Sequence, residues 1–584
     1  MDIPAKRTYE KKYAVFARNN PDIARKKALR QLFPKFVTGG STVARGRTRH
    51  GPGNSGRRFP PARKGHFRPY RKEKPRTALF VRANLPSPLD KNLFFSKWQV
   101  KLFSCIVKCS ANCSTFSASS ASVTGIHGRI ALPFFARIFI GGSMPCPFLR
   151  LHSLADAAPL LAVLQGRNEP EPAVPGKPGT EEQVATILHR VEKEGLEAVV
   201  DFTRRFDAPA FTEAQFKVPA AALKAAFARM DPQDLAMLQQ AVHNIRIYHE
   251  RQRENSWFIT GEDGSIMGRR VLPVDRAGLY VPGGKAGSTP LISSLLMGAI
   301  PAQAAGVQEI AVVSPPGPDG TIHEAILAVA HLLGITEVYA AGSAWGVAAL
   351  AFGAGPLAPV DVIAGPGNIY VATAKRLLLG RVGIDMIAGP SEILVIADHT
   401  ANPAWAAADM LSQAEHDPIA SALCLCTDEA LAHAIHAEVA RQAALLPRKD
   451  IAAHSLQKYS AVAVVPNIAT AVNIANAVAP EHLELLVQDP WAVMPGIRHA
   501  GAVFMGHHAA EALGDYMAGP NHVLPTMGTA RFASPLGVET FCKKMSIVAP
   551  SAAFSRSNAA HVARFARMEG LEAHARSALC RGEG

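Results

Sequence analysis

At 584 residues the chain is too long for one hydrophobic core, and a 48% share of hydrophobic residues is typical of a folded protein. The net charge of +15 is unevenly divided, because residues 1–143 hold 29 Lys and Arg against 5 Asp and Glu, whereas the rest holds 33 against 42. This balance excludes nucleic-acid binding by the larger, acidic part. No apolar run reaches the roughly 20 residues of a membrane span. The 8 cysteines give no disulfide framework and the N-terminal residues show no signal-peptide pattern, so we expect a cytoplasmic protein.

Residues 1–143 have no sustained helical or strand periodicity. Basic clusters at 45–49 and 57–76 alternate with Gly, Pro and Ser, and residues 110–123 are close to low complexity. This composition predicts a disordered basic extension, and a start codon placed too far upstream would give the same pattern. The alternative is a basic arm that binds RNA or an acidic surface.

From Met144 the sequence acquires the periodicities of folded structure. Apolar residues at helical spacing predict three helices, at 152–165, 180–205 and 220–253. Residues 257–273 predict a hairpin with its turn at Glu262–Gly264.

Strands and helices alternate from residue 274. Repeated strand–helix units of this length predict an α/β fold with parallel sheets and right-handed crossovers. One of the helices contains Pro301, and a short terminal helix is expected at Glu569–Ser577. The predicted strands lie at 277–284, 309–316, 337–343, 360–368, 421–428, 460–467, 483–487 and 501–506.

The first candidate site is LSQAEHDPIAS, residues 411–421. Gln413 and His416 are three apart, which would place an amide oxygen and an imidazole on one face of a helix. Two such ligands can begin a metal site, but zinc normally needs four.

Further candidates lie toward the C-terminus. The loop at residues 513–526 offers Asp515 and His522, and residues 569–574 offer Glu569 and His574. Each alone is compatible with an ordinary turn or surface pair. Together Gln413, His416, Asp515 and His574 form an N/O ligand set that suits Zn²⁺ and also Mn²⁺ or Co²⁺, although spacing does not establish that they meet.

Glu481 and His482 are adjacent acid/base residues with different ordinary pKa values. A His can take a hydroxyl proton, and a Glu can activate water. The alternative is an exposed pair at the start of a helix. The glycine turns at 283–285 and 365–367 lack a dinucleotide or Walker fingerprint, so no motif shows nucleotide binding, although such strand-end turns are where α/β sheets hold ligands.

From about residue 144 to 577 the sequence resembles the histidinol dehydrogenases, zinc- and NAD-dependent enzymes of the last steps of histidine biosynthesis. The resemblance rests on VPGGKAGSTP, AGPGNIYVATAKR, GIDMIAGPSEILVIAD, LSQAEHDP, APEHLELL, GDYMAGPNHVLPT, ARFASPLGVETF and EGLEAHARS, which occur in the family's order.

This resemblance implies a role for each candidate residue. Glu481 and His482 would be the acid/base pair in the NAD-dependent oxidation of L-histidinol to L-histidine through L-histidinaldehyde. Tyr280 and Asn368 would contact the nucleotide. One zinc ion would be bound by Gln413, His416, Asp515 and His574. The substrate would be contacted by these four residues and by Ser391, His482, His522 and Glu569.

One position departs from the family's pattern. Trp345 stands where its members usually have a Gln that contacts the nucleotide, and an indole cannot donate and accept as an amide does. It could stack on a ring instead, so we expect altered cofactor affinity.

The resemblance also implies an architecture of two incomplete Rossmann-like parallel-sheet domains with small helical N- and C-terminal segments. The implied assembly is a homodimer in which the C-terminal tail reaches the partner's site. The expected parts are the extension 1–143, a helical segment 144–169, a main metal-bearing domain of 170–279 and 391–536, an inserted nucleotide-binding domain 280–390, and the tail 537–584.

Rival functions use the same residues. A zinc-dependent dehydrogenase of another amino alcohol, or a zinc hydrolase, could use this metal set and acid/base pair. A nucleic-acid binder would draw only on residues 1–143, and no membrane association is expected.

Overall fold

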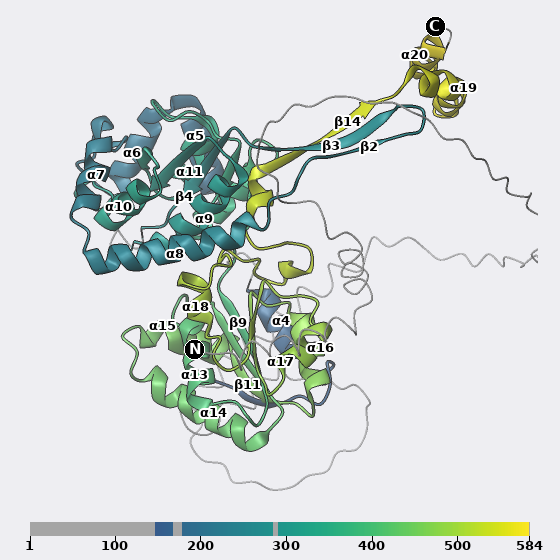
Figure 1. Ribbon diagram of the computed structural model, residues 1–584. Coiled ribbons are helices and arrows are strands. Elements are labelled where there is room, and N and C mark those ends of the chain that lie inside the picture. Colours follow the sequence, from purple (N-terminus) through teal and green to yellow (C-terminus); the bar gives the residue numbers. More distant parts are fainter. Residues whose placement is uncertain (1–145, 168–177, 284–289, 583–584) are drawn as a thin grey trace, which may run out of the picture. The chain divides into compact units, whose positions relative to one another are not determined.

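The computed structural model describes residues 146–167, 178–283 and 290–582, and contains two parallel sheets and one antiparallel sheet (Figure 1). The extension 1–143 and the turn residues Gly284 and Lys285 lie outside the described residues. The predicted α/β class with parallel sheets is confirmed. No helix in the described part of the chain is long and apolar enough to cross a membrane.

The larger parallel sheet has six strands in the order β1-β11-β10-β9-β12-β13. Its central strands are apolar almost throughout, as expected where helices cover both faces. Residues of β9 and β10 are all buried. The strands are β1 (Phe148–Arg150), β9 (Glu392–Ala397), β10 (Ser421–Cys426), β11 (Ala461–Val464), β12 (His482–Leu486) and β13 (Ala502–Met505).

Two hydrophobic clusters lie against this sheet, one with side chains of α13–α15 and the other with side chains of α4 and α16. The helices of this part are α4 (Ala158–Gly166), α13 (Pro403–Ala414), α14 (Glu429–Ala443), α15 (Lys449–Tyr459), α16 (Ile468–Val478), α17 (Pro490–Val493) and α18 (Glu511–Tyr516).

The smaller parallel sheet has five strands in the order β6-β5-β4-β7-β8. The chain adds strands on one side of β4 and then crosses to the other side, so the strand order reverses between β4 and β7. The strands are β4 (Arg276–Tyr280), β5 (Glu309–Ser314), β6 (Glu337–Ala340), β7 (Val362–Ala364) and β8 (Gly383–Ile384).

Helices α9 and α11 both contact β4 (Figure 1), and the helices of this part form two groups by their mutual contacts. α7–α10 make one group, and α5, α6, α11 and α12 make the other. Their bounds are α5 (Thr180–Glu194), α6 (Leu196–Phe206), α7 (Ala220–Ala228), α8 (Pro232–Glu250), α9 (Ile292–Ala305), α10 (Glu324–Leu332), α11 (Ser343–Phe352) and α12 (Ile369–Leu377).

The expected domain division needs correction for residues 180–250. The expected division grouped them with the six-stranded sheet, where the metal ligands are predicted, but α5–α8 share one hydrophobic cluster with the five-stranded sheet. Their apolar faces, with Val184, Phe202, Leu223 and Ile245 buried, cover α9–α12 and not β9 or β12. Pro301 is inside α9, as predicted.

The antiparallel sheet joins the hairpin to the C-terminal tail. The predicted hairpin is confirmed as β2 (Trp257–Thr260) and β3 (Ile266–Pro273), and β14 (Cys542–Ala549) pairs with all of β3. Two helices follow, α19 (Ala552–Met568) and α20 (Glu572–Gly582), which pack on each other.

Both terminal segments differ from the expectation of small helical pieces. The tail contains β14, whose residues are mostly exposed on both faces and so show no alternation, and the segment 144–169 contains β1, which extends the six-stranded sheet beside β11. The predicted terminal helix at Glu569–Ser577 corresponds to α20 and begins only at Glu572, because Glu569 is the C-cap of α19 and Gly570 turns the chain at a φ of 75°.

Candidate active site

The buried acid/base groups of the six-stranded sheet lie where β9 and β12 begin. After α16 ends, Ala479 adopts a left-handed conformation with a φ of 51°, and the chain turns into β12. Glu481 and His482 follow and are only 7% and 4% exposed. They therefore form a buried pair at the start of a strand, which excludes the alternative of an exposed pair at the start of a helix.

Both side chains of this pair bond to a single residue of the neighbouring strand. The Glu392 N–H donates to Glu481 Oε2 at 2.9 Å, and His482 Nδ1 lies 2.9 Å from the Glu392 carbonyl oxygen. Because a carbonyl oxygen only accepts, Nδ1 carries the hydrogen. In the neutral imidazole the free lone pair is then on Nε2, which is the atom available as a base.

Helix α18 brings further carboxylates to His482. Glu511 Oε1 lies 3.5 Å from His482 Nε2. His482, Glu511 and Asp515 present ligand-type atoms that all lie within 4.8 Å of one another. His522 Nδ1 lies 3.5 Å from Asp515 Oδ1.

Burial strongly affects the proton affinities of this cluster. It lowers the pKa of His482, against the opposing effect of the Glu511 charge, and so favours the neutral base. It raises the pKa of Glu481 and of Glu484 well above the usual carboxyl range. Titratable groups perturbed in this way are typical of active sites.

Asp515 behaves differently from these carboxyls. Its burial would raise its pKa, but the His522 hydrogen bond and the charges of His522, His482 and His416 lower it. The structure therefore brings His416, Asp515 and His522 together with His482, although they are distant in sequence.

Gln413 and His416 come from the end of α13. Asn402 caps the start of this helix with its side-chain oxygen, and Pro403 occupies the first turn, where no amide hydrogen is needed. Gln413 lies in the last turn and is 2% exposed. His416 lies beyond the last helical residue, so the predicted pairing on one helix face is replaced by a turn in which the His416 N–H donates to the Gln413 carbonyl at 3.1 Å.

Ser391 lies at the same edge, directly before β9. Its carbonyl accepts from the Ser421 N–H at 3.0 Å, which fixes the backbone where β9 and β10 begin. The predicted substrate contact is therefore adjacent to Glu392, to which Glu481 and His482 bond.

The predicted nucleotide contact Tyr280 lies at the carboxyl end of β4, in the five-stranded sheet. Its hydroxyl accepts from the Ser343 N–H at 3.0 Å, at the start of α11. Gly365, after β7, has a φ of 126°, and a Cβ there would stand 2.1 Å from the Tyr280 carbonyl oxygen. Two strand ends thus approach closely where the strand order reverses, which is where open α/β sheets hold ligands.

Polar atoms without partners lie at this same edge. Asp207 Oδ2 and Ser314 Oγ are buried and have no hydrogen-bond partner among the described residues. Burial raises the pKa of Asp207 to about 6. A Cβ on Gly342 would lie 2.9 Å from Asp207 Oδ2, so the backbone before α11 approaches this carboxyl closely.

The other two expected nucleotide contacts are engaged within the protein. The Asn368 side chain caps α12 by accepting from the N–H groups of Tyr370 and Val371. Trp345 is 4% exposed, donates to Thr203 Oγ1, and stacks on Phe202 and Phe206 at centroid distances of 5.9 and 5.5 Å.

Glu569 and His574 are exposed on the tail. Within the described residues neither makes a hydrogen bond or ion pair with the cluster around His482. The intrachain cluster therefore contains His416 and Asp515 but not His574, and Gln413 is buried in the helical turn that precedes His416.

Sequence reasoning missed Glu392, Glu511, Glu484 and Asp207. Two of them could have been found from the sequence. Glu392 and Glu484 lie inside the apolar runs EILVIA and HLELL, where a charged residue is unusual. Glu511 and Asp207 lie in polar stretches with no such contrast.

Comparison with known proteins adds to this geometry. The family model described as histidinol dehydrogenase matches residues 176–582. A histidinol dehydrogenase of Nitratidesulfovibrio vulgaris is 59% identical over 438 residues, which are 75% of this chain and 99% of that protein. One from Oleidesulfovibrio alaskensis is 55% identical over 434 residues, which are 74% of this chain and 99% of that protein.

A solved structure agrees with these relatives. The crystal structure of histidinol dehydrogenase from Elizabethkingia anophelis has a TM-score of 0.69 and 34% identity, and the match covers 76% of this chain and 99% of that one.

The paired parallel sheets, the buried acid/base pair and these relatives define an oxidoreductase. The chain belongs to the histidinol dehydrogenase family.

Proposed function

We propose that the chain oxidises L-histidinol to L-histidine through L-histidinaldehyde, with two NAD⁺ reduced in succession, as the last steps of histidine biosynthesis. The observation that carries the proposal is the buried Glu481–His482 pair, in which the Glu392 carbonyl fixes the imidazole tautomer. The substrate is inferred from the name of the relatives, and the base is inferred from the geometry of His482.

His482 is the base of the first oxidation. Its Nε2 takes the hydroxyl proton while the hydride passes to the nicotinamide, which is the oxidant that NAD⁺ supplies when bound. Glu481, whose pKa burial raises above the usual carboxyl range, then assists His482 in adding water to the aldehyde. Once its first proton has passed to solvent, His482 again takes a hydroxyl proton, this time from the hydrate, and a second NAD⁺ would accept the hydride.

The residues at the cluster fit a zinc ion. Gln413, His416 and Asp515 are N and O donors that suit Zn²⁺, and three imidazoles already surround the Asp515 carboxylate. Zinc there would hold and orient the imidazole and amine of the substrate. His522 and Ser391 would contact the substrate beside it, and the fourth ligand would be His574 of the partner subunit.

The five-stranded sheet fits a dinucleotide. Within the described part of the chain, the buried Asp207 Oδ2 and Ser314 Oγ have no hydrogen-bond partner, so they could accept from and donate to ligand hydroxyls at the switch point beside Tyr280. The N-termini of α11 and α12 start at this edge and suit phosphate groups. The ring of Trp345 already stacks within the protein, so we assign it to packing and not to cofactor stacking.

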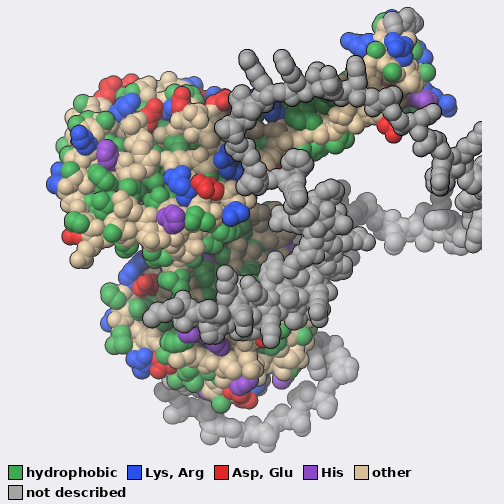
Figure 2. All heavy atoms as spheres, in the orientation of Figure 1, with side chains coloured by type: hydrophobic (Ala, Val, Ile, Leu, Met, Phe, Trp, Pro, Cys, Tyr) green, Lys and Arg blue, Asp and Glu red, His purple; other side chains and the backbone are tan. Residues whose placement is uncertain are grey.

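A homodimer that shares its sites is supported by the apolar surface of the antiparallel sheet and the tail. Phe258, Ile259, Val548, Phe565 and Met568 are 57% to 78% exposed, and Figure 2 shows hydrophobic side chains along this ribbon. Exposed patches of this kind mark interaction surfaces. An exchanged tail would bring Glu569 and His574 to the partner's site and help to retain the bound aldehyde.

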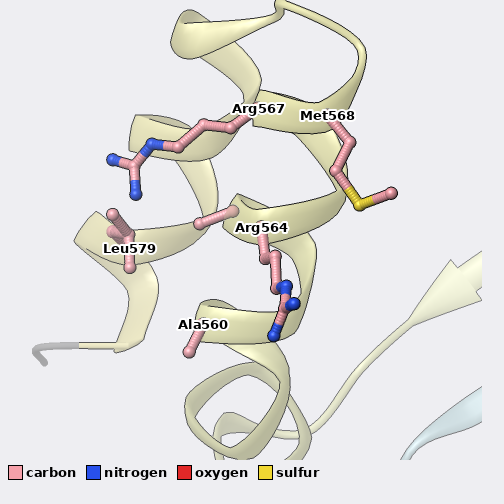
Figure 3. A pocket seen from close by; sticks show the side chains of 6 residues that line it. Ala560, Arg564, Arg567, Met568 and Leu579 are labelled. Carbon is pink, nitrogen blue, oxygen red and sulfur yellow. The ribbon is translucent and has the colours of Figure 1, made fainter.

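The tail also carries a groove of about 430 Å³ between α19 and α20, lined by Arg564, Arg567, Met568 and Leu579 (Figure 3). Ala563, Ala566 and Ala575 form the small core beneath it. Small residues let the two helices approach closely, which gives the tail a defined shape for docking.

The test is NADH absorbance with purified full-length protein, L-histidinol and NAD⁺. We expect two NADH for each histidine formed, loss of activity with a chelator, and recovery with Zn²⁺. Faster oxidation of another amino alcohol would identify a different substrate. Hydrolysis of an amide or ester without NADH formation would identify a zinc hydrolase instead.

A further inference from the structure

Glu392 contacts both members of the catalytic pair through its backbone alone. It is the first residue of β9 and is 3% exposed. Its N–H holds Glu481 and its carbonyl holds His482, both at 2.9 Å. The orientation of the two catalytic side chains therefore depends on where this one peptide segment lies.

The strand register explains why these backbone groups are available. The pairing of β9 with β12 begins with Ile393 opposite His482, one residue after Glu392. On the other side, Glu392 is paired with Ser421 of β10. The N–H and the carbonyl of Glu392 therefore lie at the end of that ladder, where the side chains of Glu481 and His482 bond to them.

The side chain of Glu392 is held from two sides. Arg167 pairs with Glu392 Oε1, and the Met527 N–H donates to Oε2 at 3.1 Å. Both side chains of the ion pair are almost fully buried, with 1% and 4% exposed. Burial raises the pKa of Glu392, and Arg167 acts in the opposite direction, so Arg167 favours the charged carboxylate.

Arg167 is itself fixed by its other donors. Its Nε donates to the Leu164 carbonyl and one terminal nitrogen donates to the Ile419 carbonyl, both at 3.1 Å. Arg167 caps α4, and Ile419 lies in the turn that follows His416. The ion pair thus ties the N-terminal helix to β9 and to the segment that precedes β10.

We propose that Arg167 and Glu392 are positioning residues that hold the Glu392 peptide where it sets the tautomer of His482 and orients Glu481. Neither side chain touches the reacting atoms. The proposal rests on the assignment of Glu481 and His482 as the acid/base pair, and it adds the N-terminal helix to the parts on which catalysis depends.

The test compares Glu392→Gln and Arg167→Gln with a matched control, Arg276→Gln, in the full-length protein. Arg276 forms a partly buried cluster with Glu309 and Glu337 at the opposite end of the five-stranded sheet, where β4 and β5 begin. For the Arg167 and Glu392 variants we expect kcat to fall about 10- to 100-fold while KM for histidinol and NAD⁺ stays within about twofold. The control should lose stability but keep kcat.

A second readout needs no substrate. In protein with ¹⁵N-labelled histidine, with His482 assigned by its loss in His482→Asn, we expect the Nδ1–H tautomer in wild type and a mixture of tautomers in both variants. Arg167→Lys keeps the charge but loses carbonyl contacts, and should give an intermediate kcat.

The proposal is overturned if kcat in both variants matches the Arg276→Gln control, or if the His482 tautomer is unchanged. If Arg167→Gln does not fold, Arg167→Lys and Glu392→Gln decide by the same two readouts. Failure of the proposed function is distinguishable, because wild type would then form no NADH from histidinol while the tautomer comparison would still report on positioning.

Discussion

The two parallel sheets have the same kind of strand order, yet their polar groups gather at opposite ends of their strands. In the five-stranded sheet Tyr280, Ser314 and Gly365 lie where β4, β5 and β7 end or just beyond. In the six-stranded sheet Glu392 and His482 lie where β9 and β12 begin. In both, the strand pair concerned is the one at which the strand order reverses.

Helix direction gives this difference a physical meaning. Helices α11 and α12 begin at the polar edge of the five-stranded sheet, so their N-termini favour anions such as a pyrophosphate. Helices α13 and α16 end next to the polar edge of the six-stranded sheet, and helix C-termini favour cations. One edge therefore suits a nucleotide and the other suits a metal ion.

The connection between the sheets is short, because only residues 385–391 separate β8 from β9. Asp385 in this link forms a buried ion pair with Lys375 and accepts from the Gly365 N–H at 2.8 Å. The chain thus passes directly from the carboxyl-end edge of one sheet to the amino-end edge of the other.

The largest expected effect comes from removing the zinc ligand that the partner subunit is proposed to supply. We expect His574→Ala to lose most bound zinc, measured by metal analysis, and to lose activity with it, because one of four ligands is absent. Mixing it with His482→Asn should restore part of the activity, since a hybrid dimer can assemble one site with both residues. Gln413 and His416 are unchanged in both variants, so a loss of zinc in His574→Ala is due to the missing His574.

No recovery in the mixed sample, with subunit exchange verified by mass spectrometry of differently tagged chains, would contradict a tail shared between subunits.

A smaller effect is expected from a variant that separates the roles proposed for Glu481 and His482. We expect Glu481→Gln to slow the overall reaction about 10²- to 10³-fold, because water addition to the aldehyde loses its assisting group. Separate assays with histidinol and histidinaldehyde should show the larger loss in the second. Equal histidinaldehyde oxidation by Glu481→Gln and wild type would refute this assignment.

The smallest effect concerns the nucleotide edge. Asp207 has a raised pKa of about 6, above the value of 3.8 for an unperturbed Asp, so its folded form binds a proton more tightly than its unfolded form. Its presence therefore costs stability as the pH rises from about 4 through 6, and the cost persists above 6. We expect Asp207→Asn to gain ~1–2 kcal/mol at pH ~7.5 and nothing at pH ~4, after allowing for its partial exposure.

Denaturant unfolding at both pH values measures this change, and NAD⁺ titration of the same variant should show weaker binding. A gain at pH ~4 equal to that at pH ~7.5 would exclude the carboxyl charge as the cause. Unchanged NAD⁺ affinity would exclude Asp207 as a nucleotide contact.

Much of the fold followed from the sequence, because apolar strands between helical patterns have few alternatives to parallel sheets. The positions of β10–β13 were predictable for this reason, and the hairpin at 257–273 was predictable from its turn residues. The packing of α5–α8 on the five-stranded sheet was not, since an amphipathic helix shows that it packs but not on which sheet. β1 was missed because three residues carry almost no periodicity.

Candidate residues for the site could be proposed from the sequence, but their geometry and the buried carboxyls around them could not. Glu481 and His482 are acid/base types wherever they lie, yet only the structure shows that both bond to the Glu392 backbone. A contact through a peptide group leaves no mark in the sequence, since any residue provides it. The burial of Trp345 against Phe202 and Phe206 likewise depends on the packing of α11 on α6.

The division of labour between the two sheets is tested most directly by His482→Asn, with NAD⁺ binding and NADH formation measured on the same sample. The account predicts NAD⁺ affinity within about twofold of wild type, unchanged zinc content, and both oxidations slower by on the order of 10³-fold. NADH formation at near the wild-type rate, or loss of NAD⁺ binding together with activity, would contradict it.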